Sequence, residues 1–199
     1  SWNEREDDYA SVAFWYQTGL PTFAERAPGT NERRLPDLAR VVVKARDLAG
    51  AKRHGEGEVT TAASDLYGGD ILVYRPARAA GSWLEFPIEV KAKEPLRLEV
   101  SAERSPDKGL YQAFLDGVKI GQPLEFYADE PSEAVFPLLD FWPDPGTHVF
   151  RLECVGKNPR SSGYACAIDS VRLLERRPRV GDFGHDKDKD WKKNPTIYY

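Results

Sequence analysis

The sequence predicts an all-β fold, an antiparallel β-sandwich, and three observations support that prediction. From residue 69 onward, short apolar or alternating runs recur at the spacing of roughly 8–12 residues that sandwich strands show. The chain contains 15 Pro and 16 Gly, which supply the turns between such strands. The clearest alternation lies at 146–155, where Phe150, Leu152 and Cys154 share one face and charged residues alternate with them. That pattern is typical of a strand with one buried face.

The first half of the sandwich is expected to contain four strands. The run 41–48 opens with three consecutive valines, and 70–74 is a short apolar run bounded by glycine and, after one arginine, proline. The run 82–90 alternates until Pro87 shifts its phase, whereas 96–102 alternates cleanly. Branched and aromatic side chains of this kind suit a pleated, half-buried surface.

An Asp-Gly pair at 116–117 separates the runs 110–115 and 118–120. This dipeptide favours the type I′ turn, because both central residues of that turn need a positive φ. We therefore expect a tight hairpin here. Two further strands are expected at 124–127 and 135–141.

The runs 146–155 and 165–174 flank a connector, 156–163, that is rich in turn-forming residues. We expect these two runs to form an antiparallel hairpin that closes the sandwich. Cys154 and Cys166 lie one on each run, which permits a cross-strand disulfide in an oxidising compartment. The alternative is two small buried residues that never bond, and the strict geometry of a disulfide favours this alternative.

The run Tyr9–Gln17 contains three consecutive aromatic residues, and the stretch after it offers no obvious partner strand. A lone apolar strand cannot satisfy its own hydrogen bonds. The run resembles the terminal strand of glycoside hydrolase family 172, although Phe14 stands where that family more often has Tyr. The resemblance implies a double jelly-roll parent that acts on fructofuranosides and arabinofuranosides and assembles as an oligomer. The family's catalytic glutamates would precede Ser1, so no catalytic residue is expected in this chain.

The stretch 40–176 resembles a galactose-binding-like β-sandwich, a jelly-roll architecture found in carbohydrate-binding-module families 6 and 35. The resemblance rests on the segments 81–86, 115–117, 146–148 and 167–173. It implies an accessory domain of the kind that trails many bacterial polysaccharide-active enzymes.

The sequence offers weak metal-binding patterns. The two module families often open with Glu-Ala-Glu, whose carboxylates hold a structural calcium, but this chain has Lys44-Ala45-Arg46 there, with Asp47 and Asp169 as the remaining carboxylates. His54, with two nearby glutamates, is expected to lie in a solvated turn, the alternative being a metal or acid–base site. The segment 186–190 imitates an EF-hand loop but lacks its glycine. We expect neither a metal nor a cofactor.

A sugar site in such a sandwich would stack aromatic rings on sugar C–H faces and use a few polar groups for orientation. The candidate residues are three aromatic residues at loops or strand–loop borders and two hydroxyl partners: Trp142, Tyr127, Tyr164, Asp144 and Asn158. The alternative is packing, in which Trp142 seals one end and other aromatic residues, Trp83 among them, fill the core.

Composition disfavours several function classes. The net charge of −4 and the pI near 5.5 argue against nucleic acid as a partner. No apolar run approaches the roughly 20 residues that cross a bilayer, so no membrane partner is expected. Nucleophile-elbow and P-loop motifs are lacking. The remaining functions are an accessory portion that braces a glycoside hydrolase or its oligomer, a carbohydrate-binding module with its own site, and, least favoured, a free-standing glycosidase.

Three regions are expected. Residues 1–38 are the terminal strand and linker of an upstream jelly-roll catalytic domain, 39–177 the accessory sandwich, and 178–199 an extended arm that lies on a neighbouring domain or subunit. The expected partners are the upstream domain or another chain that pairs with Tyr9–Gln17, an oligo- or polysaccharide, and further copies in a homo-oligomer. A start at Ser1 with no Met predicts a processed product or a fragment, and a secreted or periplasmic location is favoured.

Overall fold

The computed structural model describes residues 39–44, 47, 51–79, 81–176 and 192, and Tyr9–Gln17 lies outside them. The described residues form eleven β-strands in two antiparallel sheets, which confirms the predicted all-β sandwich. The strands are β1 (Ala39–Lys44), β2 (Lys52–His54), β3 (Gly57–Ser64), β4 (Gly69–Pro76), β5 (Trp83–Val90), β6 (Leu96–Arg104), β7 (Leu110–Leu115), β8 (Val118–Glu125), β9 (Ser132–Phe141), β10 (Gly146–Gly156) and β11 (Cys166–Glu175).

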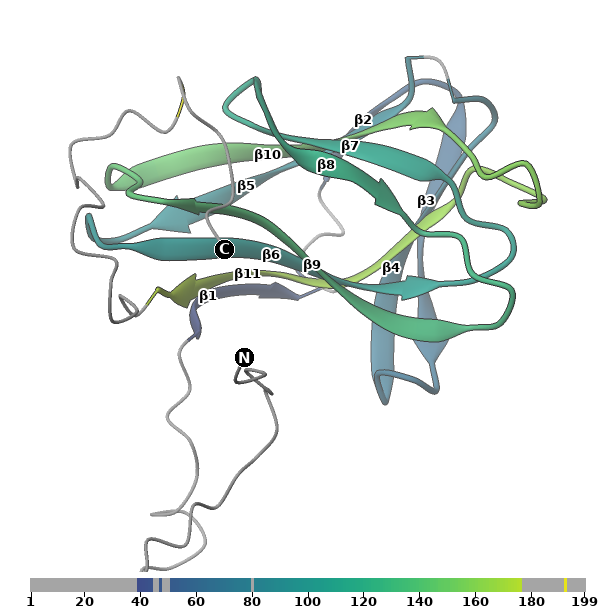
Figure 1. Ribbon diagram of the computed structural model, residues 1–199, viewed down its shortest axis with the longest axis horizontal. Helices are drawn as coiled ribbons and strands as arrows, with labels where there is room; N and C mark the ends of the chain where they lie inside the picture. The colour runs from purple at the N-terminus through teal and green to yellow at the C-terminus, as the bar shows by residue number, and fades with distance from the viewer. Residues whose placement is uncertain (1–38, 45–46, 48–50, 80, 177–191, 193–199) are drawn as a thin grey trace, which may run out of the picture. The chain divides into compact units, whose positions relative to one another are not determined.

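The two sheets differ in size and connectivity. The six-stranded sheet has the order β3-β4-β11-β6-β9, and β1 also pairs with β11. The five-stranded sheet has the order β2-β5-β10-β7-β8. Figure 1 shows the sheets face to face, with β5 and β10 in one layer and β6 and β11 in the other. The strands that are central in each sheet therefore face each other across the core.

One hydrophobic core fills the space between the sheets. Leu98 and Val100 of β6 and Phe150 and Leu152 of β10 are fully buried. They alternate with residues of the outer faces, as the period of two in a strand requires. Burying a side chain of this size stabilises the fold by about 1.5–3 kcal/mol relative to exposure, so each of these positions contributes substantially to the stability of the sandwich.

The last two strands do not form the predicted hairpin. β10 pairs with β5 and β7, whereas β11 pairs with β1, β4 and β6, so the connector 157–165 crosses from one sheet to the other. The hairpin prediction was wrong because alternation identifies a strand but not its sheet. Cys154 and Cys166 consequently lie in opposite sheets as buried free thiols. Burial raises the pKa of Cys166 to about 12, which leaves this thiol unreactive at neutral pH.

The predicted Asp-Gly hairpin between β7 and β8 is confirmed. Asp116 and Gly117 have φ values of 49° and 78°, the left-handed conformation of a type I′ turn. The Asp116 carboxylate accepts a hydrogen bond from the Val149 amide at 2.9 Å and contacts His148 Nδ1 at 2.8 Å. The turn is thereby tied to β10. Lys192, the described residue of the predicted arm, lies with its Nζ 3.7 Å from Asp116 Oδ2, on the same sandwich.

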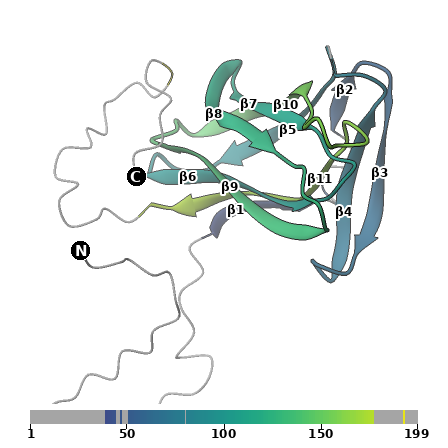
Figure 2. The same cartoon turned by 45° about the vertical axis from the view of Figure 1, so that its right-hand side comes forward.

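Two strands were not predicted from the sequence: β2 lies where a solvated turn was expected around His54, and β3 lies in a stretch for which no element was predicted. Lys52–His54 pairs with β5, and β3 pairs along its whole length with β4. β3 has few large apolar residues, and because it is an edge strand it needs only one partner. Figures 1 and 2 both show the β3–β4 hairpin running across the direction of the other strands at one end of the sandwich, which limits β4 to a short ladder with β11.

Candidate functional site

The topology separates the five candidate sugar-binding residues into two groups. The connection 126–131 precedes β9 and the connection 142–145 follows it, so the two lie at opposite ends of a ten-residue strand. At about 3.3 Å per residue, that strand is roughly 30 Å long. Tyr127 therefore lies far from Trp142, and the structure does not bring the five residues into one site.

We call the two ends the Tyr164 end and the Trp142 end. The Tyr164 end consists of the connections 105–109, 126–131 and 157–165. It contains Tyr127, Tyr164 and Asn158. The Trp142 end consists of the connections 91–95, 116–117 and 142–145, and contains Trp142 and Asp144.

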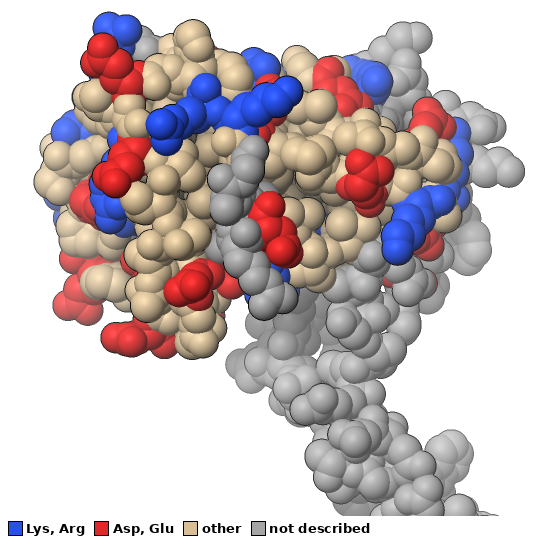
Figure 3. Space-filling view, turned by 180° about the vertical axis from the view of Figure 1, so that it is seen from behind, with Lys and Arg blue, Asp and Glu red and all other residues tan. Residues whose placement is uncertain are grey.

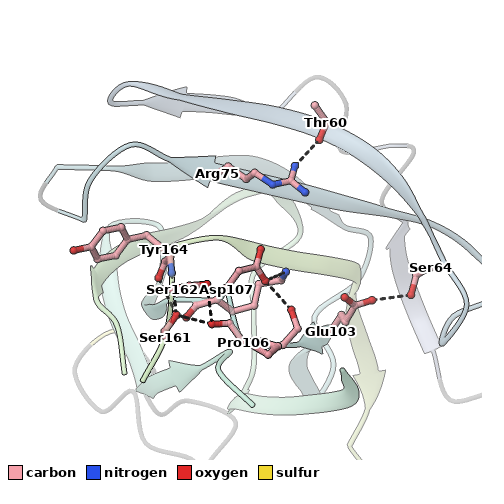
Figure 4. A network of polar contacts seen from close by, with 12 residues as sticks. Thr60, Ser64, Arg75, Glu103, Pro106, Asp107, Ser161, Ser162 and Tyr164 are labelled. Carbon is pink, nitrogen blue, oxygen red and sulfur yellow. Dashed lines mark hydrogen bonds and ion pairs between the residues drawn. The ribbon is translucent and has the colours of Figure 1, made fainter. Parts of the chain in front are cut away.

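Buried Ser161 anchors the long connector at the Tyr164 end. Its Oγ donates a hydrogen bond to the Lys108 carbonyl at 2.6 Å, and the next amide, Ser162 N, donates to the Pro106 carbonyl at 3.0 Å. Figure 4 shows these contacts meeting between the two connections. Gly163 lies so close to the other connection that a Cβ would be 2.7 Å from the Asp107 carbonyl oxygen. The two connections are therefore packed backbone against backbone.

An internal ion pair supports the same end. Lys108 is 5% exposed, and its Nζ lies 2.6 Å from Asp107 Oδ1, which also accepts a hydrogen bond from Ser105 Oγ at 2.8 Å. Burial raises the pKa of Asp107, but the contacts with Lys108 and Ser105 outweigh it and hold the pKa below its usual range. This carboxylate stays ionised, and its Oδ1 helps to hold the connection.

Tyr164 is fixed through its backbone, and its side chain packs against the edge of the core while staying partly exposed. Its carbonyl accepts a hydrogen bond from the Tyr111 hydroxyl at 2.6 Å, and Tyr111 is completely buried. The Tyr164 ring is partly exposed, and Figure 4 shows it pointing away from the Ser161 contacts. Lys157 Nζ lies 4.9 Å from the centre of that ring. Tyr164 is thus a positioned aromatic platform with a cation over one face.

Tyr127 has less to offer a ligand. It is 6% exposed, and the Arg160 guanidinium lies 5.3 Å from its ring centre. Its hydroxyl donates to Asp129, which in turn pairs with Arg160 at 3.1 Å. The Asp129 carboxylate raises the pKa of Tyr127, so the phenol keeps its proton. In this arrangement Tyr127 supports Arg160 instead of forming an open platform.

Asn158 shapes the connector and retains a donor group. Its Oδ1 accepts a hydrogen bond from the Arg160 amide at 3.0 Å, and its carbonyl accepts one from the Ser161 amide at 2.9 Å. These bonds fix the turn between Lys157 and Ser161. The side-chain NH2 group makes no hydrogen bond within the part of the chain that the structure describes, so it is available to a ligand hydroxyl.

The Trp142 end is built differently. Trp142 is partly buried, and exposed Asp144 pairs with Lys93 at 3.0 Å. The Asp144 carbonyl oxygen lies 2.8 Å from His148 Nε2. A small cavity of about 90 Å³ between Val90 and Leu96 lies at this end, well below the roughly 300 Å³ of a typical ligand pocket.

The position of Trp83 was predicted wrongly from the sequence. Trp83, expected in the core, is partly exposed on the outer face of β5, because Leu84 and Phe86 take the inward positions. It stacks on His54 at 5.6 Å, and the Arg151 guanidinium lies 4.6 Å from its ring centre. No local signal indicates this cluster, because its members come together only through the pairing of β2, β5 and β10.

Several charged groups of the sandwich are held in ion pairs. Asp169, considered for calcium from the sequence, accepts hydrogen bonds from Lys44 Nζ at 3.1 Å and from Ser170 Oγ at 2.7 Å. Within the described ranges no three His, Cys, Asp or Glu side chains gather to hold a metal ion. The face seen in Figure 3 has both signs of charge interspersed. Among the described residues no helix is long and apolar enough to cross a membrane.

Known proteins resemble this chain in structure and not detectably in sequence. No protein-family model matches the chain, and neither does any curated protein. A xanthan lyase from Paenibacillus superposes with a TM-score of 0.56 and 22% identity over 76% of this chain and 14% of the lyase. A GH26-CBM35 β-(1,4)-mannanase from Podospora anserina gives 0.51 and 17% over 72% of this chain and 29% of the mannanase.

The structural neighbours also include isolated modules. A family 35 carbohydrate-binding module from Clostridium thermocellum gives a TM-score of 0.45 and 12% identity over 68% of this chain and 98% of the module. Other neighbours are carbohydrate-binding modules of families 6 and 36. The similarity to the xanthan lyase and to the mannanase shows the fold of the chain. The chain spans only a minor part of the length of these two enzymes.

Proposed function

We propose that this sandwich is a non-catalytic accessory domain of a carbohydrate-active enzyme and binds carbohydrate at the Tyr164 end. The observation that supports the proposal is the presentation of Tyr164, whose backbone is fixed by buried Tyr111 while its ring stays partly exposed. The fold it shares with domains of polysaccharide-active enzymes adds support.

The chemistry of this end suits sugar recognition. An aromatic ring can stack on the C–H face of a pyranose or furanose, and a few polar groups then fix its orientation. Tyr164 offers the ring, and the side-chain NH2 group of Asn158 offers a donor in the same connector. The connector is already ordered by Ser161 and Gly163, so little conformational entropy is lost when a ligand binds.

Two of the carboxylates at this end, Asp107 and Asp129, favour a non-catalytic role. A glycosidase needs one carboxyl group held protonated and a second one free to act on the sugar. Asp107 is instead held ionised by Lys108, and Asp129 is paired with Arg160 and with the Tyr127 hydroxyl. In this proposal the catalytic groups belong to a parent protein of the glycoside hydrolase family 172 type, and residues 1–38 are the end of its catalytic domain. The resemblance of Tyr9–Gln17 to the terminal strand of that family supports this parentage.

Calorimetry with the full 199-residue chain tests the proposal. The panel contains fructans, arabinans and xylans, and two variants report the location of the site. Tyr164→Leu keeps an apolar side chain against the core but removes the flat ring, so we expect it to abolish binding. Trp142→Leu makes a similar change at the opposite end, and we expect it to bind like the parent chain. Loss of binding in Trp142→Leu alone would move the site to the other end, and an inert panel would contradict the proposal.

Bracing of a neighbouring domain or subunit is the second candidate function. The outer face of the six-stranded sheet favours this function, because it exposes two apolar side chains, Val42 at 41% and Val135 at 51%. The Arg172–Glu99 ion pair lies between them on the same sheet. Interfaces between domains commonly mix apolar and polar groups in this way. Sedimentation of Val135→Glu beside the parent chain tests it, since a bracing role in a homo-oligomer predicts that the variant sediments as a smaller species.

A further inference from the structure

We propose that the Tyr164 end selects sugars that bear a carboxylate, such as uronic acids, and that Lys157 is the residue that makes this selection. The inference rests on the proposed function, because it assigns a ligand class to the same site. It depends on how Lys157 is placed relative to the ring of Tyr164 and to the other cations of this end.

Lys157 is a cation without an acidic partner. Its Nζ lies 4.9 Å from the centre of the Tyr164 ring, and across the described ranges no carboxylate comes within ion-pair distance of it. The other cations of the same loops differ in this respect. Lys108 pairs with Asp107 at 2.6 Å, and Arg160 pairs with Asp129 at 3.1 Å. Lys157 is therefore the cation of the connector 157–165 that remains free to meet an anion.

The contact that now holds Lys157 is easily exchanged. A cation over an aromatic face at a partly exposed site is a weak interaction, whereas an ammonium group forms a stronger, charge-assisted hydrogen bond with a carboxylate. A sugar that stacks on Tyr164 would displace the ammonium group from the ring face. A carboxylate on that sugar, within reach of the same lysine side chain, would form an ion pair with the displaced ammonium group. A neutral sugar would break the contact between Lys157 and the ring without replacing it.

The position of Lys157 is also fixed by its neighbours. The Asn158 side chain and carbonyl close the turn that follows it, through bonds to the amides of Arg160 and Ser161. The lysine backbone is thus held beside Tyr164, and only the flexible side chain has to move. Because the backbone is already fixed, only the freedom of the lysine side chain is lost when its ammonium group meets an anionic ligand.

Paired ligands of equal backbone test the inference by calorimetry on the full chain. The probes are glucuronoxylan, polygalacturonate and xanthan, each beside a form in which carbodiimide activation and borohydride reduction have turned the carboxylates into neutral hydroxymethyl groups. We expect at least one probe to bind about tenfold more tightly in its carboxylated form, with a ratio that falls as salt is raised. Lys157→Gln should bring that ratio close to one. Lys119→Gln, which removes an exposed charge on β8 away from this end, should keep it.

The outcomes separate the two proposals. Equal affinity for the carboxylated and reduced forms overturns the selection of acidic sugars and leaves carbohydrate binding in place. An equal drop of the ratio in Lys157→Gln and Lys119→Gln also overturns it, because the preference would then come from overall charge. No binding of any probe or of the neutral panel overturns the proposed function and this inference together.

Discussion

Replacing Tyr111 by Phe removes one oxygen atom from the base of the candidate site. The Tyr111 hydroxyl donates to the Tyr164 carbonyl at 2.6 Å, and the side chain is completely buried. Burial raises the pKa of Tyr111, so the phenol is a hydrogen-bond donor at every accessible pH. The variant keeps the ring in the core and leaves a buried carbonyl without this donor, which costs about 1–3 kcal/mol.

Thermal and chemical unfolding measure that cost. For a domain of this size, about 2–4 °C of melting temperature is lost per kcal/mol, so we expect a decrease of roughly 2–12 °C. Glycan affinity should fall as well, because the backbone that presents the Tyr164 ring is released.

Tyr74→Phe is the matched control. The Tyr74 hydroxyl is equally buried and donates to the His54 carbonyl at 3.0 Å, on a different strand pair. We expect a comparable loss of stability without a loss of glycan affinity. An unchanged melting temperature in Tyr111→Phe, or equal losses of affinity in the two variants, would refute the role assigned to the Tyr111 hydroxyl.

Three further predictions address the turns and the thiols. Gly163→Ala forces a Cβ to within 2.7 Å of the Asp107 carbonyl oxygen, so we expect a loss of about 1–3 kcal/mol in urea unfolding. Burial raises the pKa of Asp116, but the contacts with the Val149 amide, His148 and Lys192 outweigh burial and hold the pKa below its usual range. Asp116→Asn should therefore be less stable than the parent at pH 7, and this difference in stability should shrink as the pH falls below about 4. Dithiothreitol should leave the melting temperature unchanged, because both cysteines are free thiols.

Each of these predictions has a contradicting result. Full stability of Gly163→Ala would mean that the two connections are not packed as described. A stability difference between Asp116→Asn and the parent that grows in acid would reverse the sign expected for a carboxylate with a lowered pKa. Asn tolerates the left-handed conformation of this turn, so strain is not a competing cause. A melting temperature that drops on reduction would show that the cysteines are oxidised.

Most strands were predictable from the sequence because their signals are local. The alternation at 96–102 and 146–155 and the Asp-Gly pair at 116–117 each depend on neighbours in the chain. β3 was missed for the same reason. Its residues are mostly small or polar, so the sequence shows no buried face. The strand is stabilised by pairing with β4, which comes later in the chain.

Sheet membership and site geometry depend on contacts between distant residues. The stretch 156–163 was predicted to be a hairpin turn. Residues 157–165 instead run from one sheet to the other, because β10 pairs with β5 and β11 pairs with β6. Tyr127 and Trp142 were grouped as loop aromatics, and only the length of β9 shows that they lie apart. The positions of Lys157 over the Tyr164 ring and of Arg160 over the Tyr127 ring could not be predicted, because they depend on side-chain conformations and not on the spacing of residues in the sequence.

A titration followed by NMR tests the central proposal most directly. The full chain is labelled with ¹⁵N, and amide shifts are recorded while a bound glycan from the calorimetric panel is added. We predict that the shifts concentrate in 105–109 and 157–165, with the largest at Tyr164 and Lys157. Shifts concentrated in 142–148, or spread over an outer sheet face while the Tyr164 end stays silent, would contradict carbohydrate binding at this end of the sandwich.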